Sequence, residues 1–301
     1  MIWGVNVPVM KGALGSIEPF VFNALRLTAS VLVLALVDRL ERRGAPAPRT
    51  PWKVVIPLGL ATSLIYQVLF VLGIANTSAT HTGFLVASGP LWTALFAVWL
   101  GLERIKRGAW VGLGIAFVGT CLVSMAKAGG GTVGHEATLL GNGLMLGAMW
   151  VWALCAVLSR PLLARLSATR LAYLATLVSL PGHWALAIAG LSMDGRALGE
   201  GFAVAPAGWL AIIYSGALST GIAYALWNRS LIRIGPARTS VFTNLVPLVA
   251  MVLAWLMLGE WPSPLQLAGG GLVLAGLAAM RAARRASQAT EPVPAVAASA
   301  D

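Results

Sequence analysis

The chain has 301 residues, of which 58% are hydrophobic and only 10% are charged, and its mean hydropathy is +0.83. Soluble globular proteins carry about 25% charged residues, so a soluble domain is excluded and an integral membrane protein is indicated. A formal net charge of +11 would normally suggest nucleic acid as a partner, but the positions of the basic residues give the charge another explanation.

The apolar segments predict ten transmembrane helices, because backbone in lipid must satisfy its own hydrogen bonds. A β-barrel is excluded because the apolar runs are long and do not alternate with polar residues. The predicted spans are residues 1–15, 19–38, 52–74, 79–101, 108–126, 138–159, 168–191, 207–230, 236–258 and 264–283. The predicted fold class is therefore an all-α integral membrane protein.

Two of these spans match each other at an offset of 157 residues, which indicates an internal repeat. Residues 81–103 and 238–260 have no internal charge, contain Pro90 and Pro247 at equivalent positions, and each end on a glutamate. Five helices per copy is an odd number, so the second copy must cross the membrane upside down, as in many secondary transporters. The predicted units are a first five-helix repeat, an inverted second repeat and a disordered cytoplasmic tail, at 1–127, 128–286 and 287–301.

The first helix has little chain before its matched tryptophan. Trp3 matches Trp152 at an offset of 149, yet only two residues precede Trp3, whereas about a dozen residues of the matching helix precede Trp152. Either the first helix is short or the natural start lies upstream of Met1, and we favour the upstream start.

The basic residues gather in alternate loops. Seventeen lie in one set of loops, three lie in the other set, and Arg26 lies inside a predicted helix. By the positive-inside rule, this asymmetry predicts that both termini are cytoplasmic. The net charge is thus a sign of membrane topology, and no nucleic acid partner is needed to explain it.

Polar and aromatic residues in the middle of the spans predict a transport path along the axis of the bundle. Polar groups in lipid are costly unless they face the protein interior or water. His81, Ser88 and Trp92, for example, are spaced by seven and four residues and so share one helix face. The candidate substrate-binding residues are Trp3, Asn6, Tyr66, Gln67, His81, Ser88, Trp92, Trp150, Trp152, Tyr224 and Asn244. For any single residue, the alternative is a hydrogen bond that joins two helices.

Pro90 and Pro247 predict matched kinks, because proline leaves a carbonyl one turn earlier, near Val86 and Thr243, without its usual donor. A kink at equivalent positions of two repeats is a candidate hinge for alternating access.

Two groups of glycines and two glutamates are predicted to have structural roles. The glycines of 112–119 and 269–276 favour close helix packing, with a symmetric dimer interface as the alternative. Glu103 and Glu260 are each expected to cap the helix that follows them, with a gating role as the alternative. The chain is expected to act as a monomer or homodimer.

The sequence also resembles a known family. Trp3-Gly4 near the start, a proline in the middle of the fourth helix of each copy, and a glutamate before a Gly-rich helix resemble the EamA-type drug/metabolite transporters, over residues 1 to about 285. The resemblance implies a secondary transporter in the bacterial inner membrane that exports amino acids, other metabolites or cationic drugs. The bacterial aromatic amino acid exporters are the branch that we expect. No glycine follows Trp150 in the second copy, which leaves the subfamily open.

The chemistry missing from the spans is informative. All ten acidic residues lie at segment ends, in loops or in the tail, whereas ion-driven carriers usually keep a carboxylate in mid-membrane. We therefore predict a facilitator, or a carrier whose proton dependence runs through His81, and we place His183 at the membrane interface beside Trp184. No nucleophile constellation, metal cluster or ATP-binding loop is found, so we expect neither an enzyme nor a cofactor or metal.

The side chains of the spans favour a neutral substrate. Phosphorylated substrates need deep positive charge, and Arg26, the one candidate, is expected to snorkel or to pair near the end of the first helix. A zwitterion with a bulky apolar or aromatic side chain fits the polar and aromatic groups, so we expect export of such amino acids. Quaternary ammonium drugs are the alternative, because Tyr66, Trp92, Trp150 and Trp152 could form an aromatic cage.

Overall fold

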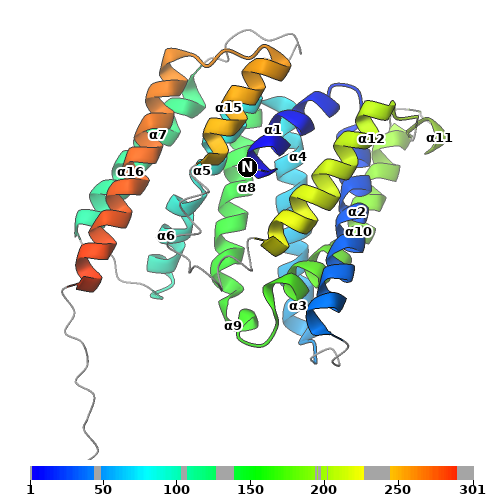
Figure 1. Cartoon of the computed structure of the whole chain (residues 1–301), viewed down its shortest axis with the longest axis horizontal. Coiled ribbons are helices and arrows are strands. Elements are labelled where there is room, and N and C mark those ends of the chain that lie inside the picture. Colours follow the sequence, from blue (N-terminus) through cyan, green and yellow to red (C-terminus); the bar gives the residue numbers. More distant parts are fainter. Residues whose placement is uncertain are drawn as a thin grey trace, which may run out of the picture.

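The computed structural model describes residues 2–43, 49–102, 107–126, 139–193, 195, 198–201, 203–226 and 245–289, and all regular structure in these residues is helical (Figure 1). Eight helices are long and apolar enough to cross a membrane. They are Pro19–Arg42, Trp52–Asn76, Ala79–Trp99, Gly108–Met125, Leu139–Leu158, Ala168–Met193, Pro206–Leu226 and Pro264–Ala283. A shorter apolar helix covers Val246–Leu258. The chain is therefore a multi-pass membrane protein.

Several of these spans are built from more than one regular segment. The helices are α1 (Ile2–Ala13), α2 (Pro19–Arg42), α3 (Trp52–Gly59), α4 (Tyr66–Asn76), α5 (Ala79–Ala87), α6 (Gly89–Trp99), α7 (Arg107–Met125), α8 (Leu139–Leu158), α9 (Arg160–Leu163), α10 (Ala168–Met193), α11 (Leu198–Gly201), α12 (Pro206–Ile213), α15 (Leu245–Leu258) and α16 (Pro264–Ala289). Two π-helical segments, η1 (Leu60–Ile65) and η2 (Tyr214–Ile222), continue α3 into α4 and extend α12.

The predicted count of ten spans is met in part. The first helix, α1, has 12 residues and is not among the eight spans. The predicted helix 236–258 is described only from Leu245 onward, and its earlier residues lie outside the described ranges. The count of ten and the inverted orientation of the second repeat stay predictions.

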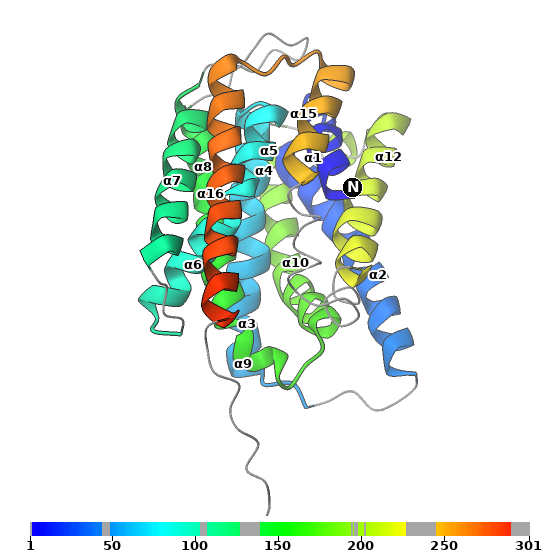
Figure 2. The same ribbon diagram turned by 60° about the vertical axis from the view of Figure 1, so that its left-hand side comes forward.

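The helices pack as a bundle with two different edges. At one edge α7 lies along α16, and α2 and α12 lie at the opposite edge (Figure 1 and Figure 2). Between these edges α8 packs against α4, α5 and α6, while α15 packs against α1 and α5. A buried apolar cluster joins α1, α2, α4, α5 and α8. Its fully buried side chains include Met10, Phe22, Ile74, Leu85 and Met145.

Glycines allow α7 and α16 to approach closely, as the sequence predicts. A Cβ atom added to Gly112 would lie 2.5 Å from the backbone nitrogen of Met280, and one added to Gly119 would lie 2.6 Å from that of Val273. Side chains at these two positions would force the helices apart, so this edge of the bundle depends on small residues.

The span Ala79–Trp99 is interrupted close to Pro90. Helix α5 ends at Ala87 and α6 begins at Gly89, with Ser88 between them. The backbone N–H of Ser88 donates to Leu85 O at 3.0 Å, which closes α5 before the proline. The break lies where the sequence predicts a kink, and its use as a hinge stays a prediction. Pro247 lies in the first described turn of α15, and Thr243 lies outside the described residues.

Candidate functional site

A fully buried arginine lies in the first half of α2. The helix begins at Pro19, where the Glu18 carboxylate accepts the backbone N–H of Val21 at 2.6 Å as an N-cap. Two turns later, Arg26 is only 2% exposed. Its Nε donates to Asn23 Oδ1 at 2.9 Å, and its Nη2 donates to Gln67 Oε1 on α4 at 2.6 Å. The predicted snorkelling of Arg26 toward the membrane surface is therefore wrong, because its charged head is held inside the bundle by two amide oxygens.

A histidine from α10 orients the asparagine of this group. His183 is 1% exposed, and its Nε2 lies 2.7 Å from the carbonyl oxygen of Ser63 in η1. A carbonyl only accepts, so Nε2 carries the proton and Nδ1 accepts the Nδ2–H of Asn23 at 3.2 Å. The predicted position of His183 at the membrane interface is wrong. Helix α10 continues past this residue to Met193, and the His183 side chain is buried inside the bundle. Asn23, Arg26, Ser63, Gln67 and His183 form what we call the Arg26 network.

An aromatic group lies next to the Arg26 network on α4. Tyr66 precedes Gln67 in the chain, and its ring lies 5.4 Å from that of Phe70 and 5.2 Å from that of Trp152 on α8, measured between ring centroids. The buried hydrogen-bonding groups of the Arg26 network thus adjoin an aromatic group that extends from the half-buried Tyr66 to the partly exposed Trp152.

A second aromatic group lines a groove of about 360 Å³ between α6, α7 and α8. Its lining residues are Trp92, Leu95, Phe96, Val98, Trp99, Trp110 and Trp150. Trp99 is 75% exposed and Trp150 is 46% exposed, so the groove opens on the outside of the bundle. Trp92 reaches inward from this groove, because its Nε1 donates to the buried Ser88 Oγ at 3.2 Å.

One end of the bundle, where α4 ends and α5 begins, is held by charged residues; we call it the α4–α5 end. The Nζ of Lys11 donates to Ile74 O at 3.1 Å and to Ala75 O at 2.9 Å, which are carbonyls of the last turn of α4. The Glu260 carboxylate accepts the backbone N–H groups of Ala79 at 3.1 Å and Thr80 at 3.0 Å, at the start of α5. Each charge therefore binds the helix end that carries the opposite partial charge.

The partner of Glu260 corrects one expectation. The sequence predicted that Glu260 caps the helix that follows it, but that helix, α16, is capped by its own residues. Ser263 Oγ accepts the N–H of Gln266 at 3.3 Å, and Gln266 Oε1 accepts the N–H of Ser263 at 2.6 Å. Glu260 is thus available for α5, about 180 residues earlier in the chain.

His81 belongs to the same α4–α5 end. It is fully buried, and its Nε2 lies 2.9 Å from the carbonyl oxygen of Ala126, which makes Nε2 the donor. Its Nδ1 lies 2.8 Å from Ser78 Oγ and 2.7 Å from Gln266 Nε2. Both ring nitrogens are therefore occupied by protein groups that join α5, α7 and α16.

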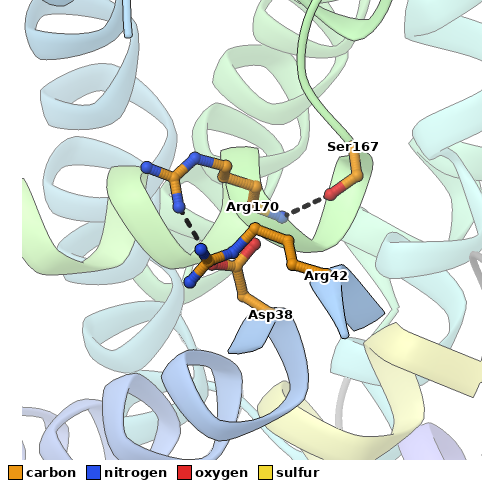
Figure 3. A network of polar contacts seen from close by, with 4 residues as sticks. All are labelled: Asp38, Arg42, Ser167 and Arg170. Carbon is orange, nitrogen blue, oxygen red and sulfur yellow. Dashed lines mark hydrogen bonds and ion pairs between the residues drawn. The ribbon is translucent and has the colours of Figure 1, made fainter. Parts of the chain in front are cut away.

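The opposite end carries an ion-pair group, which we call the α2–α10 end. Figure 3 shows Asp38 and Arg42 of α2 facing Arg170 at the start of α10, with Ser167 beside the Arg170 backbone. Asp38 Oδ2 accepts from Arg170 Nη1 at 2.9 Å and from Arg42 Nε at 3.2 Å. This group ties α2 to α10 away from the Arg26 network.

The family model for the EamA-like transporter family matches residues 1–125 and 139–282. The chain belongs to the EamA-like transporter family. It is 30% identical over 278 residues to a probable terminal-alkyne amino-acid exporter of Streptantibioticus cattleyicolor, covering 91% of this chain and 88% of the relative. It is 22% identical to a probable amino-acid metabolite efflux pump of Salmonella typhimurium, covering 92% and 90%. A solved crystal structure shares the fold, with a TM-score of 0.66 and 20% identity over 94% of each chain.

This EamA-like chain brings only part of the predicted site together. Gln67 binds the buried Arg26 and Tyr66 contacts Trp152, which is 39% exposed, while Trp92 and Trp150 share the outer groove. Other predicted members lie elsewhere. His81 lies at the α4–α5 end, and Ser88 lies in the break between α5 and α6. The Nε1 of Trp3 donates to Ser219 O of η2 at 2.9 Å, and Tyr224 is half-buried after the end of η2. Asn6 is 7% exposed, and its Oδ1 has no partner among the described residues. Asn244 lies outside the described residues.

Four members of the Arg26 network are not among the site residues predicted from the sequence: Asn23, Arg26, Ser63 and His183. The signal that could have found the first two is their spacing of three residues, which places both on one helix face. His183 carried no comparable signal. Among the described residues, no group of three or more His, Cys, Asp or Glu side chains could hold a metal ion.

Proposed function

We propose that this EamA-like protein is a secondary transporter of the bacterial inner membrane that exports small neutral metabolites by alternating access. Amino acids with bulky apolar or aromatic side chains are its proposed substrates. The observation that carries the proposal is the Arg26 network beside Tyr66 and Trp152, inside helices that are apolar enough to cross a membrane. An amino acid of this kind has polar ends for the first group and a ring or apolar chain for the second.

The proposed mechanism uses two inverted five-helix repeats with both termini in the cytoplasm. The separate matches of one family model to 1–125 and 139–282 support a duplicated unit. Helix contacts also recur between the two halves: η1 and α4 pack against α8, and α12 and η2 pack against α1. Likewise, α5 and α6 pack against α8, and α15 packs against α1. Such paired contacts are expected where two related units face each other.

The transport is proposed to be facilitated. Proton dependence through His81 is the less favoured possibility, because both ring nitrogens of that residue already bind protein groups. Counterflow of labelled substrate should therefore proceed without a pH gradient or sodium. Concentrative transport that needs a proton gradient would contradict this account of the driving force.

Export of quaternary ammonium drugs is the second candidate, favoured by the aromatic groove that contains Trp92 and Trp150. The buried positive charge of Arg26 weighs against it, because a fixed cation inside the bundle repels a cationic substrate.

Counterflow in proteoliposomes tests the substrate class. Unlabelled phenylalanine or methionine is expected to block counterflow of labelled phenylalanine, and a nucleotide sugar is expected to have no effect. If methyl viologen competes and the amino acids do not, the protein is a cation exporter instead.

A further inference from the structure

Arg26 is a buried cation that no acidic side chain of the described residues neutralises. Its side chain forms no ion pair with any Asp or Glu of the described residues, and its two hydrogen-bond partners, Asn23 and Gln67, are neutral amides. Two other cations contrast with it. Arg170 pairs with Asp38 at 2.9 Å, and Lys11 binds carbonyls at the end of α4 while interacting electrostatically with Glu260. An unpaired charge inside a protein is costly, so a partner from outside the chain would be favoured at Arg26.

The guanidinium keeps donors for such a partner. Of its five N–H groups, Nε–H binds Asn23 and one Nη2–H binds Gln67, which leaves Nη1 and the second Nη2–H without an acceptor in the described part of the chain. Neighbouring N–H groups on Nη1 and Nη2 match the two oxygens of a carboxylate, the geometry in which arginine binds this group most strongly.

The direction of the guanidinium is fixed in advance. Ser63 O accepts a hydrogen bond from His183 Nε2, and His183 Nδ1 accepts one from the Asn23 amide nitrogen. The oxygen of the same amide accepts a hydrogen bond from Arg26 Nε. Gln67 holds the other side from α4. Four segments, α2, η1, α4 and α10, thus orient one cation, which is the support that a binding site requires.

Further buried polar atoms without partners lie on the helices around Arg26. Ser30 follows Arg26 by one turn on α2, and Ser215 lies in η2, which packs along α2. Both are fully buried, and neither hydroxyl has a hydrogen-bond partner among the described residues. Buried hydroxyls normally find partners, so these two add unused hydrogen-bonding groups to the helices around Arg26.

From these contacts we infer that Arg26, held by Asn23 and Gln67, binds the carboxylate of the transported amino acid, with Tyr66 and Trp152 facing its side chain. The inference rests on the proposed function and assigns the substrate's carboxylate to one residue. Arg26 is then the residue that distinguishes a substrate with a carboxylate from a molecule of the same shape that carries an amide in its place.

The ratio of two competitors tests the inference directly. Phenylalanine and phenylalaninamide differ only in the carboxylate, and each is used to compete with counterflow of labelled phenylalanine in proteoliposomes. We expect wild-type protein to prefer phenylalanine by about tenfold or more, the size of effect that a charge-assisted bidentate contact gives. Arg26→Gln should bring the ratio close to one, and Arg26→Lys should keep part of it. A wild-type ratio near one would overturn the inference, while counterflow of phenylalanine itself would still support the proposed function.

A second variant covers the case in which Arg26→Gln does not fold. Gln67→Glu places a carboxylate at the position from which Gln67 contacts Nη2 at 2.6 Å, so the protein's own acid competes with that of the substrate. We expect counterflow to fall about tenfold or more, while the melting temperature in detergent is unchanged or higher. If Arg26 were purely structural, this added ion pair would leave transport intact, and that result would overturn the inference. Lys11→Met is the matched control: it removes the other buried cation and should leave the competitor ratio as in wild type.

Discussion

The α4–α5 end and the Arg26 network both hold a buried cation, but the groups that bind the two cations differ in charge. Lys11 lies among groups of opposite sign, with helix carbonyls at 2.9 and 3.1 Å and Glu260 bound to the next helix. Arg26 binds two neutral amides and keeps donors for which the described part of the chain supplies no acceptor. The first arrangement is complete without a ligand, whereas the second gains most from a bound anion. Burial alone therefore does not distinguish a structural charge from a binding charge; the identity of the partners does.

The largest expected effect comes from breaking the α4–α5 end. Glu260→Ala removes the acceptor for two backbone N–H groups of α5 and leaves Lys11 without its acid. Loss of one member of a buried charged group costs about 3 kcal/mol or more, so the melting temperature in detergent should fall strongly. The double variant with Lys11→Met should recover part of this loss. Equal stability of Glu260→Ala and wild type would show that the α4–α5 end is not held by this carboxylate.

A pair of histidine variants sharpens the comparison. His81→Leu and His183→Leu each remove a buried ring whose Nε2 donates to a carbonyl, so each should lower the free energy of unfolding by about 1–3 kcal/mol. Only His183→Leu frees the Asn23 amide, so only that variant should reduce the preference for phenylalanine over phenylalaninamide. The two measurements are thermal unfolding and counterflow competition, made on the same preparations. A reduced preference in His81→Leu alone would reverse the roles that we assign to the two regions.

The smallest effect is expected at the break between α5 and α6, which connects the α4–α5 end to the aromatic groove. Pro90→Ala restores a donor for the carbonyl one turn earlier, so the break should straighten. If the break is a hinge, exchange should slow by about threefold or more while the melting temperature stays the same. Pro247→Ala is the matched variant and should slow exchange similarly. Wild-type rates in both variants would remove the hinge from the mechanism.

The local features of the fold could be predicted from the sequence, and the contacts across the bundle could not. Long apolar runs predicted the spans, the glycines of 112–119 and 269–276 predicted close helix packing without naming the partner helix, and Pro90 predicted the break of its span, because each depends on nearby residues. The partner of Glu260 depends instead on which helix end lies beside it in space. The prediction that Glu260 caps the next helix in the chain, α16, was therefore wrong, because it considered only neighbours in the sequence.

The candidate site shows the same limit. The polar or aromatic character of Tyr66, Gln67 and Trp152 in mid-span predicts a place in the site, and Tyr66 contacts Trp152 while Gln67 binds Arg26. The sequence does not predict Arg26 as a site residue, because an arginine in a membrane helix commonly reaches toward the surface. What keeps it inside is an amide from α4 and an asparagine oriented from α10, and neither contact is visible in the residues around position 26.

The π-helical segment η1 lets its span absorb a change of length. A π-helical turn holds about one residue more than an α-helical turn, so deleting one residue from η1 would let the segment close into an ordinary α-helix instead of turning everything that follows by the ~100° that each α-helical residue contributes. Gln67 would then still face Arg26. A single-residue deletion within Leu60–Ile65 is therefore a change that relatives of this protein could carry while keeping every helix and every binding side chain in place.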